Sequence, residues 1–235
     1  IMGAIYRREM GSFFSSSIAY VFLAVFYLFS GYFFYLATIK SSSADISGMF
    51  SSLFLVLVFL IPILTMKLFS EEKKQKTDQG LLTAPVSLAS IVLGKYFAAM
   101  TLYTIAVSVV FIHGVILSFF GSIAWESLVS NWLALILLGF AFTSVGLFIS
   151  SLTENQVVSA VASFVVLMLF YMIDVISGLV NIEFIQKILS SLSFYTRYYE
   201  FTCGIFNMAS VLFFVSVAVI FNFLTVRVFE KRRWS

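Results

Sequence analysis

The chain has 235 residues; 61% are hydrophobic and 18% are aromatic, whereas only 11% are charged. This composition excludes an ordinary water-soluble domain, in which about a quarter of the residues carry a charge. The net charge of +3 arises from basic residues next to apolar runs, so it gives no reason to expect a nucleic-acid partner. Because apolar runs recur along the whole chain, we expect one integral membrane domain comprising residues 1–235.

Residues 5–14 mix Arg7 and Arg8 with large apolar side chains, which suits a short amphipathic helix in the membrane interface. A simple anchoring sequence is the alternative. Six apolar runs follow, and most approach or exceed the roughly 20 residues that a helix needs to cross a membrane. The chain is therefore predicted to be an all-α integral membrane protein, with transmembrane helices at residues 18–39, 50–66, 91–120, 132–150, 157–180 and 208–229.

Lysine and arginine gather in three segments. The N-terminus, residues 67–95 and residues 227–233 together hold 11 of the 14 basic residues. The positive-inside rule places these segments in the cytoplasm, and an even number of helices puts both termini there. We therefore expect a multi-pass protein with both ends in the cytoplasm.

Residues 67–95 form the one long charged segment. Within it, residues 71–76 favour a helix and mix both signs of charge, as is typical of a solvated helical face. Lys95, in the third apolar run, is expected to extend its ammonium to the interface. A charged helix followed by an exposed Leu81-Leu82 pair fits a groove on a soluble partner. A plain cytoplasmic loop is the alternative.

Two other connections are informative. At residues 150–156, Thr153 and Gln156 have the spacing of a capping box that opens the fifth span, and Glu154 favours the positive end of that helix. The connection from about residue 181 to residue 207 lies outside and is too apolar for a free loop. Its apolar residues recur at roughly helical intervals, and we expect either an external gate or a lid that packs on the bundle.

Motifs for chemistry are missing from the sequence. There is no GxxxxGK[ST] phosphate loop, GxSxG elbow or HExxH pair. One cysteine, Cys203, and one histidine, His113, are too few for a metal site built from these residues. We therefore expect no catalytic, cofactor-binding or metal site in this chain.

Two polar residues, Asp174 and His113, fall inside predicted spans. Each lies about 25 Å along its helix at about 1.5 Å per residue, which places it near the outer surface. We expect water at the membrane interface to solvate both side chains; the alternative is that they line a transport pathway.

Three segments carry a family resemblance by their order and position: KLFSEEKKQKTDQGLLTAPVSLASIVLGK, then GLFISSLTENQ, then the terminal EKRRW. Together they resemble the permease subunits of type-II ABC exporters, in particular the gliding-motility and nitrous-oxide-maturation branch (GldF/NosY-like). The opening YRREMGSFFSSSIAYVFLAVFYLFSGYFF resembles the same branch. The resemblance covers essentially the whole chain. It implies an interfacial helix before six spans, and short re-entrant-like helices between the fifth and sixth.

The resemblance also implies partners. These are cytoplasmic ABC ATPase subunits that hold ATP and magnesium, a second permease in a homodimer or related heterodimer, membrane lipid and, in this branch, a GldG-like auxiliary membrane protein. The first inner loop of the family supplies the coupling helix that contacts the ATPase, and the second supplies a lesser contact. Carried over, the ATPase-coupling residues are Glu71, Glu72, Lys73, Lys74, Thr77, Leu81, Leu82, Pro85, Thr153, Glu154, Asn155 and Gln156.

The sequence thus predicts the permease subunit of an ATP-driven ABC exporter in the bacterial cytoplasmic (inner) membrane. One alternative is a secondary transporter or channel that works without ATP. Such proteins usually show inverted repeats, broken helices or charge near the midplane, and none is clear here. Another is a non-transporting membrane subunit of a mechanotransmission-type ABC complex. No feature of the spans indicates a substrate.

Overall fold

The computed structural model describes the chain apart from residues 1, 44, 78–85, 122, 180–181 and 235, and apart from the side chain of residue 234. All elements of the described part are helices. In chain order they are α1 (Met2–Ser15), α2 (Ser17–Phe34), the π-helix η1 (Tyr35–Ile39), α3 (Ser47–Thr65), α4 (Lys67–Lys74), α6 (Leu88–Val107), α7 (Val109–Ser118), α8 (Trp125–Leu152), α9 (Gln156–Leu179), α10 (Glu183–Ser191), α11 (Phe194–Thr202) and α12 (Met208–Trp234).

The described residues contain six helical segments long and apolar enough to span a membrane: Ser17–Ile39, Ser47–Lys74, Leu88–Ser118, Trp125–Leu152, Gln156–Leu179 and Met208–Arg233. The predicted all-α integral membrane fold is thereby confirmed, together with the count of six. Two boundaries differ most from the prediction. The second helical segment continues through charged α4, and the fourth begins at Trp125, because polar residues extend both helices beyond their apolar stretches.

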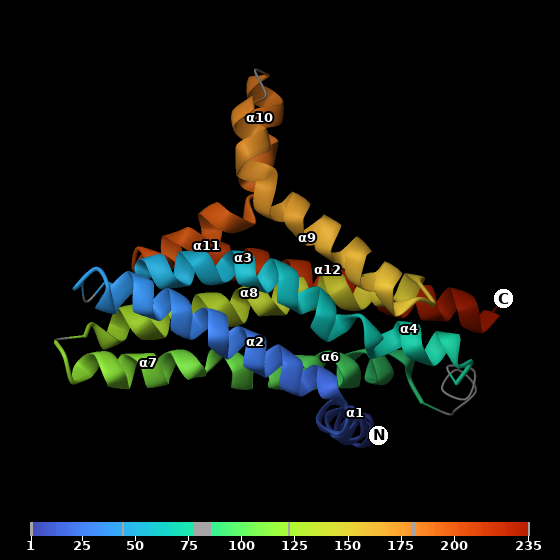
Figure 1. The fold of residues 1–235 in the computed structure, drawn as a ribbon. Coiled ribbons are helices and arrows are strands. Elements are labelled where there is room, and N and C mark those ends of the chain that lie inside the picture. Colours follow the sequence, from blue (N-terminus) through green and yellow to red (C-terminus); the bar gives the residue numbers. More distant parts are fainter. Residues whose placement is uncertain (1, 44, 78–85, 122, 180–181, 235) are drawn as a thin grey trace.

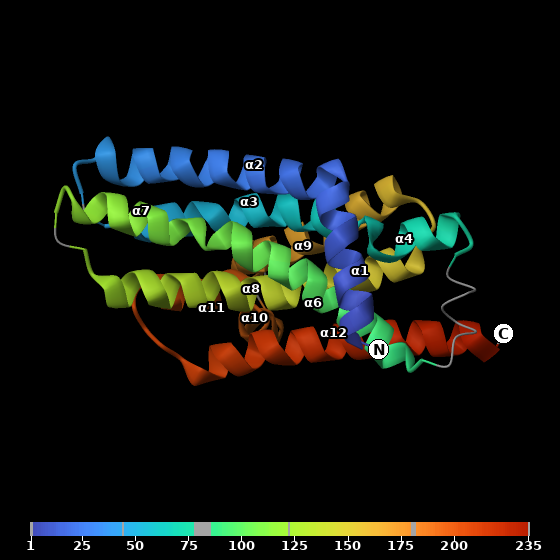
Figure 2. The same ribbon diagram turned by 90° about the horizontal axis from the view of Figure 1, so that it is seen from below.

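The spans lie side by side, with α8 at the centre of the bundle (Figures 1 and 2). In the most apolar 18-residue stretch of α8, 78% of the residues are buried, whereas in that of α9 only 17% are. Helix α1 crosses one end of the bundle at a steep angle to the spans. The same end carries α4, the start of α6 and the last turns of α12, and both termini lie there. We call it the basic end.

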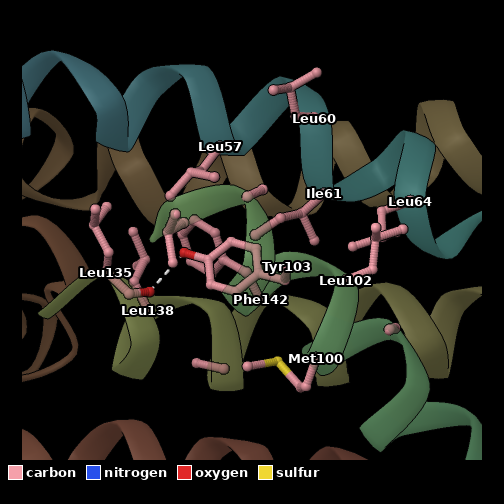
Figure 3. Close-up of a cluster of buried hydrophobic side chains, with 14 of the residues drawn as sticks. Leu57, Leu60, Ile61, Leu64, Met100, Leu102, Tyr103, Leu135, Leu138 and Phe142 are labelled. Atoms are coloured by element: carbon pink, nitrogen blue, oxygen red, sulfur yellow. Dashed lines mark hydrogen bonds between the residues drawn. The ribbon is translucent and has the colours of Figure 1, made fainter. Parts of the chain in front are cut away.

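The core holds α3, α6 and α8 together through large apolar side chains and close backbone contact (Figure 3). The hydroxyl of buried Tyr103 in α6 donates a hydrogen bond to the carbonyl oxygen of Leu135 in α8, at 2.6 Å. The Tyr103 ring lies against Gly139, where an added Cβ would overlap it. Gly146 of α8 meets Thr65 of α3 in the same way. Glycine at such contacts allows membrane helices to approach closely.

The segment between the last two spans forms two short helices. Helix α11 returns to the bundle, where the hydroxyl of buried Tyr198 donates to the carbonyl oxygen of Phe50 at 2.8 Å. Helix α10 packs mainly against α9 and has no buried residue. The end of α9 and α10 together stand away from the bundle (Figure 1). We call residues 172–179 and 182–192 the arm. The expectation of a lid packed on the bundle thus holds for α11 and is wrong for α10.

Candidate functional site

Helix α4 is attached to α8 at its first turn. Met66 keeps helical backbone angles (φ −55°, ψ −32°) between α3 and α4, and its side chain does not cap α4. The cap comes from Ser150 of α8, whose buried hydroxyl accepts hydrogen bonds from the amides of Phe69 and Ser70, at 3.1 and 3.2 Å. The same hydroxyl donates to the carbonyl oxygen of Met66 at 3.1 Å. A serine that satisfies the first amides of a helix stabilises it, and here it also joins two helices.

The last turn of α4 is attached to α8 as well. Lys73 is only 8% exposed, and its ammonium donates a hydrogen bond to the carbonyl oxygen of Ser151. A cation at the carboxyl end of a helix is favourable, because the final carbonyl groups of the helix carry partial negative charge. Both ends of α4 are therefore bonded to the last turn of α8.

Glu72 links α4 to two further helices. One of its carboxylate oxygens lies 2.6 Å from the guanidinium of Arg8 in α1 and 3.0 Å from the ammonium of Lys95 in α6. A carboxylate oxygen of Glu9 in α1 lies 2.7 Å and 3.0 Å from the same two cations. These four residues, Arg8, Glu9, Glu72 and Lys95, form a charge cluster in which two anions balance two cations.

The cluster is largely shielded from solvent. The side chain of Lys95 is 1% exposed, that of Glu9 11% and that of Glu72 17%. The Lys95 ammonium also lies 5.1 Å from the centre of the Phe69 ring, a cation–π contact. The expectation that Lys95 extends to the interface is therefore wrong. Its charge is tolerated inside the protein because two carboxylates lie within hydrogen-bonding distance.

Arg8 closes the cluster on its exposed side. Burial lowers the pKa of its guanidinium, but the hydrogen bonds and charges of Glu9 and Glu72 outweigh that influence and raise the pKa above its ordinary value. Arg8 therefore stays charged at every physiological pH. A cavity of about 450 Å³ adjoins the cluster, and its charged lining consists of three cations and three carboxylates: Arg8, Lys67, Lys95, Glu9, Glu71 and Glu72.

The predicted coupling residues of the first loop divide between two faces of α4. Glu71 is half-buried, whereas Lys74 and Thr77 are exposed. Glu72 and Lys73 face other helices of the same chain, so the expectation that residues 71–76 form one solvated face is wrong for these two. Leu81, Leu82 and Pro85 lie outside the described residues.

The second predicted contact, Thr153–Gln156, joins α8 to α9. The side-chain oxygen of Asn155 accepts a hydrogen bond from the amide of Val157 at 2.9 Å, so Asn155 caps α9. The Thr153 hydroxyl instead donates to the carbonyl oxygen of Asn155 at 3.4 Å. The predicted Thr153–Gln156 capping box is therefore wrong. Glu154 and Asn155 are exposed, and α4 packs against both α8 and α9, so the two predicted coupling segments meet at the basic end.

Sequence reasoning missed four members of this site. These are Arg8 and Glu9 in α1, Lys95 in α6 and Ser150 in α8; apart from the adjacent pair Arg8–Glu9, their partners lie far away in the sequence. The available signal was charge: an acid inside an apolar amphipathic segment and a lysine inside an apolar run both require compensation. Identifying which residues compensate one another requires the fold.

The two polar residues within the spans have partners in the protein. His113 is 8% exposed, and its ring stacks on Phe34 with the ring centres 4.7 Å apart. The explanation by interfacial water is therefore wrong for His113. Asp174 accepts hydrogen bonds from the hydroxyls of Ser193 and Thr196, at 2.6 and 3.1 Å, which joins α9 to the start of α11. The described residues contain no group of His, Cys, Asp or Glu placed to hold a metal ion.

The comparison with protein families agrees with this architecture. The model of a family described as "ABC-2 family transporter protein" matches residues 4–234. No curated protein matches the chain. The family match includes all six spans and the whole charged junction formed by α1, α4, α6 and α8. The chain therefore belongs to the ABC-2 transporter family, as a multi-pass permease subunit of an ABC transporter.

Proposed function

We propose that this permease belongs to an ATP-driven exporter of the GldF/NosY-like branch, and that a separate cytoplasmic ATPase drives it through α4. The bonding of α4 carries this proposal. Its inner side is joined to α8 by Ser150 and Lys73, and to α1 and α6 by Glu72. Its outer side leaves Lys74 exposed for a soluble partner. We place this end in the cytoplasm of a bacterium, on the inner membrane, because basic residues concentrate there.

Movement of α4 by the ATPase would move several helices as one body. Removing one partner from a buried ion pair costs about 3–5 kcal/mol, so displacement of the helices together is favoured over rupture of the cluster. Since α8 is the most buried span, a shift at Ser150 and Lys73 reaches the centre of the bundle. Rigid-body shifts of packed helices are a common way to open a path between subunits.

The remaining partners follow from the same proposal. ATP and magnesium bind the ATPase and not this chain. A second permease, identical or related, completes the path, and the exposed apolar residues of the arm, such as Phe184 and Ile188, support a contact within the membrane. A GldG-like auxiliary membrane protein and surrounding lipid complete the assembly.

The ATP-independent alternative needs charged groups near the middle of the spans to couple transport to an ion gradient. In the described part of the chain, the lysine and glutamate residues that are buried, namely Glu9, Lys73 and Lys95, gather instead at the basic end. This arrangement favours transmission of force from one side over an ion relay across the membrane.

Co-purification with the cognate ATPase tests the proposal. Lys74→Glu together with Glu71→Lys reverses charges on the outer side of α4, and we expect the ATPase to be lost from the detergent-solubilised complex. Glu183→Lys on exposed α10 serves as the control and should retain it. Retention of both the ATPase and its permease-stimulated ATP hydrolysis in the α4 variant would contradict a coupling role. Gradient-driven flux by the permease alone in liposomes would favour the alternative.

A further inference from the structure

A second cavity, of about 670 Å³, lies at the basic end between the start of α6 and the last turns of α12. It shares no lining residue with the cavity next to the charge cluster. The α6 side contributes Ser87, Leu88 and Ala89, and the α12 side contributes Val226, Arg227, Glu230, Lys231 and Arg233.

The charges that line the two cavities differ. The cavity at the charge cluster has as many carboxylates as cations. The second has three cations, Arg227, Lys231 and Arg233, and one carboxylate, Glu230, which lies 2.7 Å from Arg227. The α6 side adds a hydroxyl and apolar groups but no carboxylate. Two positive charges are thus left uncompensated, and they favour an anion in this cavity.

Of the three cations that line this cavity, Lys231 and Arg233 are available to bind an anion. Arg227 is held by Glu230 and by the Phe223 ring, whose centre lies 4.9 Å from the guanidinium carbon. Lys231 and Arg233 are exposed, and no carboxylate of the described residues forms an ion pair with either. They can therefore bind an anion without losing an existing partner.

An apolar strip leads along α12 to this cavity. Val219 and Phe223 are 62% and 54% exposed, and Arg227 and Lys231 continue the same spacing of four residues, which places all four on one side of the helix. Val226 and Leu88 add apolar lining to the cavity itself. The site therefore presents positive charge at the end of a membrane span and an apolar surface along the span.

We propose that this cavity binds the phosphate-bearing headgroup of an anionic phospholipid, with an acyl chain along Val219 and Phe223. The inference depends on the basic end lying at a membrane surface, and does not depend on the ATPase or on a second permease. Anionic lipids attract basic groups at this level, and each lysine or arginine changes affinity by about fivefold. Free phosphate shares the headgroup's charge but lacks the apolar part.

Binding to the purified full chain in neutral detergent tests the proposal. The probes are dioctanoyl phosphatidylglycerol, dioctanoyl phosphatidylcholine and inorganic phosphate, with affinities measured by thermophoresis. We expect the anionic lipid to bind at least tenfold more tightly than either of the other two. Lys231→Gln with Arg233→Gln should weaken the anionic lipid by about 25-fold and leave phosphatidylcholine unchanged, because two charges are lost.

Two further variants separate the cavity from general charge attraction. Lys74→Gln with Lys76→Gln removes two exposed cations from the same end but outside the cavity, and should change affinity less than twofold. Ala89→Asp keeps every cation, places a carboxylate at an exposed position of the cavity lining, and should weaken the anionic lipid at least fivefold. Equal binding of the two lipids, or an equal loss in the Lys74/Lys76 variant, would overturn the proposal. Phosphate binding as tight as that of the anionic lipid would overturn the choice of a lipid.

Discussion

The junction at the basic end and the arm have opposite surfaces. At the junction, charged side chains such as Glu9 and Lys95 are buried and bonded across three helices. In the arm, apolar side chains such as Phe184 and Ile188 are 73% and 46% exposed, and α10 has no buried residue. Buried charge thus joins helices of one chain, whereas exposed apolar surface is left for lipid or other subunits.

The physical reason is the solvent around a membrane protein. Lipid tails are as apolar as leucine, so apolar surface gains little by leaving lipid for protein. A buried charge without a partner costs far more free energy than a misplaced apolar side chain. The fold therefore favours the one arrangement in which each buried charge meets its partners. Accordingly we expect substitutions at the junction to lower stability strongly and substitutions in the arm to act mainly on association.

The largest effect is expected from Lys95→Met. It removes a cation that touches two carboxylates, and leaves Glu9 and Glu72 with Arg8 as their common cation. We expect the free energy of unfolding to fall by about 3–5 kcal/mol, the usual cost of breaking a buried ion pair. Thermal unfolding in detergent measures it. Lys67→Met, at a partly exposed lysine of the same end, is the control, and an equal loss in both would contradict the importance of the cluster.

A smaller, local effect is expected from Asp174→Ala. The substitution removes the acceptor for Ser193 and Thr196 at a partly exposed carboxylate, and we expect a loss of about 1.5–3 kcal/mol for the two bonds together. Amide hydrogen exchange should therefore become faster in residues 183–202 while α3 and α8 keep their protection. Faster exchange throughout the bundle would show that this contact supports the whole fold and not only residues 183–202.

Ser150→Ala should cost about 1 kcal/mol in unfolding free energy, because α4 loses its cap. We expect the ATPase still to bind and its hydrolysis to become less dependent on the permease. Ser190→Ala in exposed α10, which removes a bond to the carbonyl of Lys187, is the matched control and should change neither quantity. Normal coupling in Ser150→Ala would argue against transmission from α4 to α8.

The smallest effect on stability is expected from Phe184→Ser with Ile188→Ser. Both side chains are exposed, so the unfolding free energy of the single chain should change by less than about 0.5 kcal/mol per site. If the arm contacts a second permease, the same variant should shift the complex toward monomers in size-exclusion chromatography with light scattering. A large loss of monomer stability would mean that the arm belongs to the core of the chain.

Much of this fold could be predicted from composition and local pattern. The six apolar runs predict six spans because a membrane core requires a minimum length of apolar helix. Residues 5–14 fall within α1, and the region between the last two spans contains short helices as expected. The family resemblance predicted a functional role for residues of α4, and two of them, Glu72 and Lys73, are members of the junction.

The sequence by itself determined which segments are helical, how many can cross a membrane and where positive charge collects, since each depends on neighbouring residues. Only the tertiary structure decided that Lys95 is buried between Glu9 and Glu72, that Ser150 caps α4 and that Asn155, not Thr153, caps α9. The first two are pairings between residues far apart in the chain, and the third depends on the backbone geometry of a short turn. The first two follow from how the helices pack, and local pattern carries no record of such long-range pairings.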